Sequence, residues 1–266
     1  MVQLAITANW RNSEDLAIIR EQSASTLAPR EFLVFLVAQS DRASPLLRML
    51  NIDRNFDIAV RFYEEPGINK DLVELAEYVI TGGLSKFHAA SLFLQNEELS
   101  TAYSGYLFLD GDLEFNVEQI PNFLRVASAL KLNLAQPAVS RTSYCYWKMA
   151  YHQRGFVFRE TSFVEVMAPY ISRNALSDVL PTFTRSISTY GLDLVWPYLV
   201  GNAGIGVVDA FQIGHRDRVD HSSGKFYRYL KSIGVDLDVE EQRILQEYGV
   251  KPQTAFSRRG YFWNQQ

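Results

Sequence analysis

YLFLDGDLEF, residues 106–115, joins an apolar run of strand length to an acidic turn. Asp110 ends the run, Gly111 separates it from Asp112, and Glu114 lies just beyond. Carboxylates this close repel each other and resist removal from water. We therefore expect either a positive group between them or good solvation of both.

Strands and helices alternate on either side of this stretch. Continuous apolar runs such as EFLVFLVAQ are typical of strands covered on both faces, and segments with helical spacing lie between them. Strands are predicted at 31–39, 56–65, 106–112, 132–140, 159–169 and 204–216. Helices are predicted at 43–50, 69–81, 84–99, 116–131, 172–184, 192–200, 224–234 and 238–249.

This alternation predicts an α/β fold with a mostly parallel central sheet flanked by helices, in a single Rossmann-like domain. Ligands of such sheets bind beyond the carboxyl ends of the strands, which is where Asp110 and Asp112 lie. Pro137 interrupts the strand at 132–140, so we expect that strand to be near an edge or to end there. Residues 1–30 are predicted to hold a short strand and an amphipathic helix.

The composition excludes several classes of protein. The 266 residues carry a net charge of −4 and contain one cysteine, Cys145. Without a basic field we expect no nucleic-acid partner, and a single cysteine forms neither an internal disulfide nor a Cys-rich zinc site. No apolar run is long enough for a transmembrane segment, and the N-terminus lacks a signal-peptide pattern. We expect a cytoplasmic protein, free or attached to a membrane surface.

The Asp-Gly-Asp turn has three interpretations from its residues alone. Two carboxylates across a tight turn can bind one divalent cation, Mn²⁺ or Mg²⁺, which would neutralise a departing diphosphate as in glycosyl transfer from a nucleotide sugar. A strand ending in Asp-x-Asp also begins haloacid-dehalogenase-like phosphatases, although there the motif is on the first strand. The third interpretation is a solvated turn, because Asp-Gly is a common turn pair.

The order of several further segments resembles the family catalogued as domain of unknown function 707. The likeness spans roughly residues 31 to 230 and rests on YLFLDGDLEF with LVFLVAQSDRASPLL, RNFDIAVRFYEE, GGLSKFHAASLFL, LAQPAVS, FVEVMAPYISRNAL, YGLDLVWPYLVG and GVVDAFQIGHRDRV. Members of this family resemble nucleotide-diphospho-sugar glycosyltransferases of the GT-A type. Relatives usually have a more acidic cluster in place of Asp110-Gly111-Asp112, and many have His-Thr-Arg-Pro where this chain has His215-Arg216-Asp217-Arg218.

The resemblance implies roles for the acidic turn and for three other residues. Asp112 would bind the metal directly, Asp110 would bind it through water or touch the ribose, and His215 at the end of the last strand would be the third ligand. An inverting transferase needs a base for the acceptor hydroxyl, and Asp193 in YGLDLVW is the first candidate. Glu165 in FVEVMAP is the second candidate base.

Further residues are expected to bind the nucleotide donor. A local basic loop and one helix lysine suit the phosphates, and residues after the first two strands would flank the base and the ribose. The predicted donor-binding residues are Ser40, Asp41, Tyr63, Lys86, Asp110, Arg216, Arg218 and Lys225.

The sequence thus predicts a metal-dependent, hexosyltransferase-like enzyme that moves a sugar from a nucleoside diphosphate to a glycan or another hydroxyl acceptor. We expect an extension at 1–30, a GT-A-like domain at 31–235 and a helical tail at 236–266. The main alternative is a non-catalytic relative that binds a nucleotide or a glycan.

Overall fold

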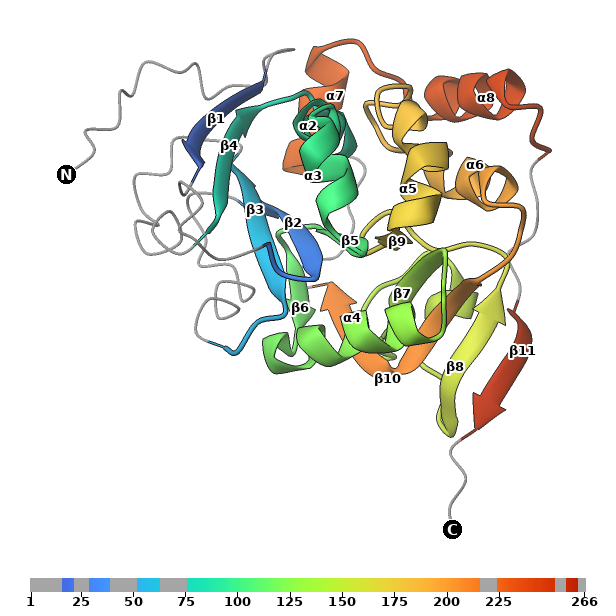
Figure 1. Ribbon diagram of the computed structural model, residues 1–266. Coiled ribbons are helices and arrows are strands. Elements are labelled where there is room, and N and C mark those ends of the chain that lie inside the picture. The colour runs from blue at the N-terminus through green and yellow to red at the C-terminus, as the bar shows by residue number, and fades with distance from the viewer. Residues whose placement is uncertain are drawn as a thin grey trace.

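The computed structural model describes residues 16–21, 29–38, 52–62, 76–215, 224–251 and 257–262, drawn in colour in Figure 1. Several predictions lie outside these residues. They are the helix at 43–50, most of the segment at 1–30 with its expected amphipathic helix, and the donor-binding roles of Ser40, Asp41, Tyr63, Arg216 and Arg218.

One sheet runs through the described part of the chain. Its strands are β1 (Leu16–Glu21), β2 (Phe32–Ala38), β3 (Phe56–Phe62), β4 (Tyr78–Gly82), β5 (Gly105–Leu109), β6 (Leu113–Phe115), β7 (Leu134–Val139), β8 (Phe156–Thr161), β9 (Tyr170–Ser172), β10 (Ile205–His215) and β11 (Ser257–Phe262). Their order is β1-β4-β3-β2-β5-β9-β7-β10-β8-β11, with β6 paired to β10.

Most of the central strands run in the same direction, and antiparallel pairs are formed by the short β9 in the middle and by β1, β6, β8 and β11. Strands β4, β3, β2 and β5 pair in parallel, and so do β7 and β10. The short β9 is antiparallel to both β5 and β7, so the two parallel groups point the same way. The carboxyl ends of β2, β3, β4, β5, β7 and β10 therefore meet at one edge, which confirms the predicted fold class.

The helices connect and cover these strands. They are α2 (Lys86–Leu94), α3 (Glu97–Ala102), α4 (Ile120–Ala129), α5 (Arg173–Val179), α6 (Leu192–Leu199), α7 (Lys225–Ser232) and α8 (Leu237–Glu247), with 3-10 turns η2 (Val117–Gln119), η3 (Lys148–Ala150) and η4 (Leu180–Thr182). Side chains at their starts cap free N–H groups. Asn116 accepts from Glu118 N at the start of η2, and Ser85 caps α2.

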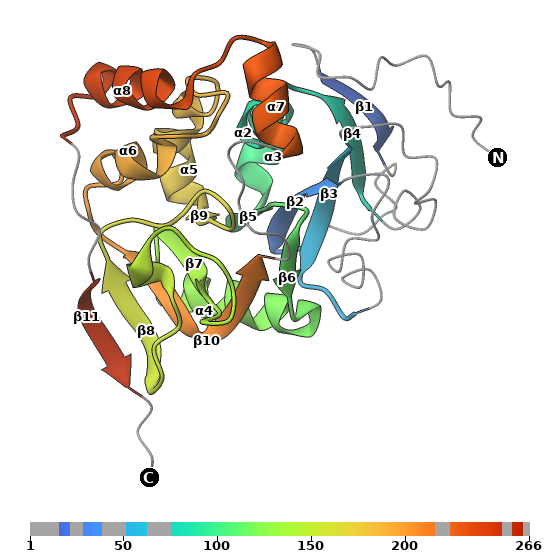
Figure 2. The same ribbon diagram turned by 180° about the vertical axis from the view of Figure 1, so that it is seen from behind.

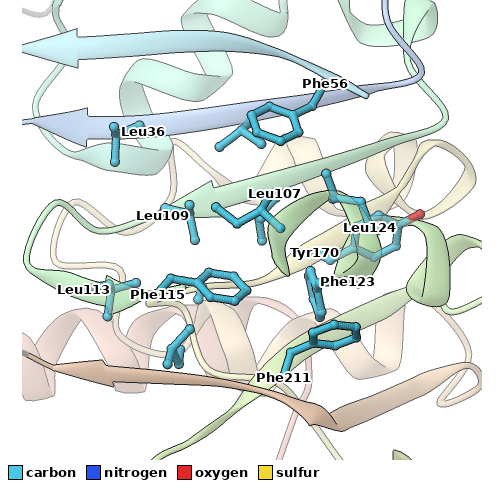
Figure 3. Packing of buried hydrophobic residues seen from close by; sticks show 14 of the residues in the cluster. Leu36, Phe56, Leu107, Leu109, Leu113, Phe115, Phe123, Leu124, Tyr170 and Phe211 are labelled. Carbon is cyan, nitrogen blue, oxygen red and sulfur yellow. The ribbon is translucent and has the colours of Figure 1, made fainter. Parts of the chain in front are cut away.

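Alternating side chains send two hydrophobic clusters to opposite faces of the sheet. In β2, Phe32, Val34 and Leu36 join α4 residues on one face, whereas Leu33, Phe35 and Val37 join residues of α2, α3, α5, α6 and α8 on the other. Figure 3 shows the α4 side, where Phe123 and Leu124 reach the side chains of β5 and β10. Burial of β2 on both faces explains its continuous apolar run.

The structure differs from two of the predicted helices. Residues 78–82 form β4 rather than the end of a helix at 69–81, because β-branched and aromatic side chains there pair in parallel with β3. The predicted helix at 84–99 is divided into α2 and α3, since Asn96 caps a new helix by accepting from Glu98 N.

Two strand predictions also needed correction. β7 lies inside the sheet rather than at its edge. Pro137 is tolerated because β9 pairs only with Leu134 and Ala135, and because the β10 register shifts directly after Val208, which lies opposite Pro137. The predicted strand at 159–169 is divided between the end of β8 and a loop, and β10 is not the last strand, because β11 pairs with β8.

The borders of the fold bear on the predicted division into segments. β1 pairs with β4 at one edge and β11 with β8 at the other, as Figure 2 shows from behind. The boundaries at 30 and 235 stay predictions. Among the described residues, no helix is both long and apolar enough to span a membrane.

Candidate active site

The acidic turn lies where β5 gives way to β6, at the shared carboxyl edge of the sheet. β6 turns back to pair antiparallel with β10, and its first residue, Leu113, lies opposite His215. This register brings Asp112 beside His215, with 3.6 Å between Asp112 Oδ2 and His215 Nδ1. The predicted pair of a turn aspartate and a late histidine is thus assembled by strand pairing.

Gly111 has a steric reason to be glycine. A Cβ atom built there would lie 2.1 Å from the carbonyl oxygen of Val37, at the end of the buried central strand β2. A side chain would have to displace that backbone or the turn itself. The close approach of the turn to β2 therefore accounts for glycine at this position.

Lys86, the first residue of α2, is bound to Asp110. Its Nζ atom lies 2.6 Å from Asp110 Oδ1 and donates to the carbonyl oxygens of Val166, at 2.5 Å, and Met167, at 3.3 Å. The lysine side chain is 5% exposed, whereas that of Asp110 is 34% exposed. The two predicted donor-binding residues thus form an ion pair whose carboxylate reaches solvent.

The charges of this cluster depend on one another. Burial raises the pKa of Asp110 and lowers that of Lys86, and the attraction between the two opposes both shifts. Burial also disfavours charge on Asp112 and His215, but their mutual interaction outweighs it. The pKa of Asp112 is therefore lowered and that of His215 is raised.

The cluster suits a divalent cation held by two side chains, Asp112 and His215, rather than one held by three protein ligands. The buried Nδ1 atom of His215 has no hydrogen-bond partner and faces a carboxylate that is 37% exposed. Mg²⁺ and similar ions often take one or two protein ligands and complete their shell with phosphates and water. No group of three or more metal-binding side chains occurs in the described ranges, and Asp110 is held by Lys86. The roles of Asp112 and His215 as metal ligands, and of Asp110 as a ligand through water or a ribose contact, stay predictions.

Glu165 lies in the loop between β8 and β9, close to this cluster. Its Oε1 atom accepts from Cys145 Sγ at 3.0 Å and from Trp147 N at 3.3 Å, while Gln136 Oε1 binds its backbone N–H at 2.6 Å. Burial raises the pKa of Glu165, and its bonds to Cys145 and Trp147 and the charge of His215 oppose the rise. The contacts of this carboxylate suit a group that holds the loops together.

Asp193 lies in the first turn of α6, where Gly191 has a φ of +82°. Burial, followed by the charges of Glu165 and Glu241, raises the pKa of Asp193 to about 8. A carboxylate with a pKa near neutrality suits a general base. Because hydrogen bonds from Cys145 and Trp147 occupy Glu165, Asp193 stays the first candidate base.

Glu240 of α8 fixes the loop that leads into α6. Its carboxylate accepts hydrogen bonds from Ser186 Oγ at 3.2 Å, Ile187 N at 3.1 Å and Ser188 N at 2.7 Å. The predicted helical tail therefore helps to position the candidate base Asp193. The sequence did not predict this contact.

The sequence also did not predict that Tyr227 of α7 lies close enough to the acidic turn to feel its charges. Burial raises the pKa of Tyr227, a hydrogen bond with Tyr190 opposes the rise, and the charges of Asp110 and Asp112 add to it. An aromatic residue in an amphipathic helix gives no signal of such a position. Lys225 begins the same helix and is exposed, and its role as a phosphate ligand stays a prediction.

Comparison with known proteins identifies the fold. No protein-family model and no curated protein matches the sequence. GalNAc-T7, solved with UDP, GalNAc and Mn²⁺, is similar over 76% of this chain with 13% identity and a TM-score of 0.51, and the chain spans 48% of that structure.

Two further structures have lower TM-scores. Glucosyl-3-phosphoglycerate synthase from Mycobacterium tuberculosis, solved with Mn²⁺, UDP and glucosyl-3-phosphoglycerate, has 12% identity and a TM-score of 0.48 over 84% of this chain and 82% of its own. TarS from S. aureus, solved with UDP-GlcNAc, has 13% identity and a TM-score of 0.47 over 82% of this chain and 71% of its own. The GalNAc-T7 likeness shows that the fold matches that of GT-A glycosyltransferases.

Proposed function

We propose that this protein is a metal-dependent glycosyltransferase that moves a sugar from a nucleoside diphosphate to a hydroxyl acceptor. The observation that carries the proposal is the meeting of Asp112, His215 and the Lys86–Asp110 pair at the carboxyl edge of a GT-A fold. GalNAc-T7, with which this chain shares its fold, was solved with UDP, GalNAc and Mn²⁺.

Asp112 and His215 would hold Mn²⁺ or Mg²⁺. The cation would stabilise the negative charge that grows on the diphosphate as it leaves. Lys86 keeps Asp110 in place and adds a positive charge to the same edge. The carboxylate of Asp110 is accessible enough to touch a ribose or a water molecule.

Asp193 would take the proton from the acceptor. The acceptor oxygen attacks the anomeric carbon and forms the new glycosidic bond, while the bond from that carbon to the diphosphate oxygen breaks and its electrons leave with the diphosphate. The proton moves to the Asp193 carboxylate, whose pKa of about 8 leaves it able to bind and release a proton near neutral pH. A base on the acceptor side implies inversion at the anomeric carbon.

Hydrolysis of nucleotide sugars tests this proposal. The purified protein is given UDP- and GDP-sugars with Mn²⁺ or with EDTA, and release of the nucleoside diphosphate is measured. Release that needs Mn²⁺ and falls at least a hundredfold in Asp112→Ala is expected, whereas Asp178→Asn, at an exposed position of α5, retains activity.

The same assay separates the alternatives. Nucleotide binding without turnover would support a non-catalytic relative. Release of phosphate from simple phosphomonoesters would support the phosphatase instead.

A further inference from the structure

The loop after β7 presents a strongly exposed aromatic ring beside the candidate active site. Tyr146 is 73% exposed, the largest value for an apolar or aromatic side chain among the described residues. Its ring meets that of Trp147 edge to face, with centroids 5.1 Å apart, and Trp147 meets the buried Phe163 at 4.9 Å. The buried ring of Phe163 thus supports Trp147, which in turn contacts the exposed ring of Tyr146.

Hydrogen bonds fix this loop to the active site. Ser143 Oγ accepts from His215 N at 2.6 Å, and Cys145 N donates to Tyr151 Oη at 3.1 Å. The N–H of Trp147 donates to Glu165. The exposed ring is therefore tied by short connections to a candidate metal ligand and to a buried carboxylate.

A buried ion pair braces the far end of the same loop. Arg159 binds Asp209 through Nε at 2.7 Å and through Nη2 at 3.0 Å, and it also donates to the carbonyl oxygens of Met149 and Tyr151. A well-ordered aromatic side chain loses little conformational entropy when it binds a ligand.

We infer that Tyr146, supported by Trp147, binds a sugar ring of a carbohydrate acceptor. A pyranose has an apolar face of C–H groups that suits an aromatic ring, and hydroxyls around its rim that suit polar neighbours. A single exposed ring is too small an apolar patch for a protein interface, and the same segment carries exposed polar residues at Arg141, Thr142 and Lys148. This inference rests on the proposed function, since it names the acceptor of that reaction.

Binding of soluble oligosaccharides tests the inference directly. Chitobiose, lactose and maltotriose are titrated against the full chain, with binding followed by ligand-observed nuclear magnetic resonance. We expect at least one to bind, a loss of affinity of tenfold or more in Tyr146→Ala, and retention of most affinity in Tyr146→Phe. Leu130→Ala, an exposed apolar position at the opposite edge of the sheet, should bind like the unchanged protein.

The failure of this inference differs from the failure of the proposed function. Equal oligosaccharide binding in Tyr146→Ala, or no binding by the unchanged protein, would overturn the inference. So would a loss of UDP binding in Tyr146→Ala, because it would assign the ring to the nucleotide. Absence of donor hydrolysis in the unchanged protein would overturn only the enzymatic function, because oligosaccharide binding is measured without any donor.

Discussion

Removing the Lys86 ammonium group should reveal how strongly it is coupled to Asp110. Lys86→Met keeps an unbranched apolar stem one atom shorter than that of lysine and removes a charge that is bound to one carboxylate and two carbonyl oxygens. Breaking a buried pair from one side costs roughly 3–5 kcal/mol. Because Asp110 is 34% exposed and can be hydrated, we expect the lower end, about 3 kcal/mol.

A double-mutant cycle isolates the interaction. Asp110→Asn keeps an oxygen acceptor but leaves the buried ammonium without a counter-charge, so we expect a cost of about 2–4 kcal/mol. The double variant should lose about 1–3 kcal/mol less than the sum of the single losses, because neither charge is then left without its partner.

Urea unfolding at pH 7, followed by circular dichroism, measures the three variants against the unchanged protein. If the loss of unfolding free energy in the double variant equals the sum of the two single losses to within about 0.5 kcal/mol, the argument that the two groups stabilise each other is refuted.

Three other changes have outcomes that the structure predicts. Gly111→Ala should lower the free energy of unfolding in urea by about 1–3 kcal/mol and weaken Mn²⁺ binding, because its methyl group would press on the Val37 carbonyl. Unchanged stability and affinity would contradict the steric argument. The pKa of Asp193, raised from 3.8 to about 8 by burial and nearby carboxylates, means that the folded protein binds this proton more tightly than the unfolded chain does. The unchanged protein should therefore lose about 2–4 kcal/mol relative to Asp193→Asn as pH rises from 4 to 9, and parallel pH profiles of the unfolding free energies would refute this. Glu240→Gln should lower the free energy of unfolding by about 1–3 kcal/mol, because this carboxylate accepts three hydrogen bonds from the loop before α6. The surface control Glu247→Gln should change it by less than about 0.5 kcal/mol. Equal effects of the two changes would be inconsistent with the anchoring role of Glu240.

The sequence predicted the parts of the fold that depend on local patterns. The runs of β2 and β5 are continuous and apolar because both faces of these strands are covered. β4 was taken for a helix because its apolar spacing fits both periods, and only pairing with β3 decides between them. The sequence of β11, SRRGYF, has no apolar run and was not predicted as a strand.

The candidate site was predicted in its residue types rather than in its contacts. Strand order brings Asp112 to His215, which no local pattern contains. The partner of Asp110 is Lys86, a residue predicted for phosphate, and the carboxylate that orients the loop before Asp193 comes from α8, in the predicted tail. These contacts join segments far apart in the chain, so a single sequence gives no information about them.

Calorimetric titration of a nucleoside diphosphate with and without Mn²⁺ tests the central claim most directly. UDP and GDP are each titrated into the unchanged protein, Asp112→Asn and the surface control Asp178→Asn. Binding of at least one nucleotide should need Mn²⁺, should weaken at least tenfold in Asp112→Asn, and should be unchanged in Asp178→Asn. Binding of neither nucleotide, or binding equally tight in EDTA and in Asp112→Asn, would contradict a cation held by Asp112 and His215.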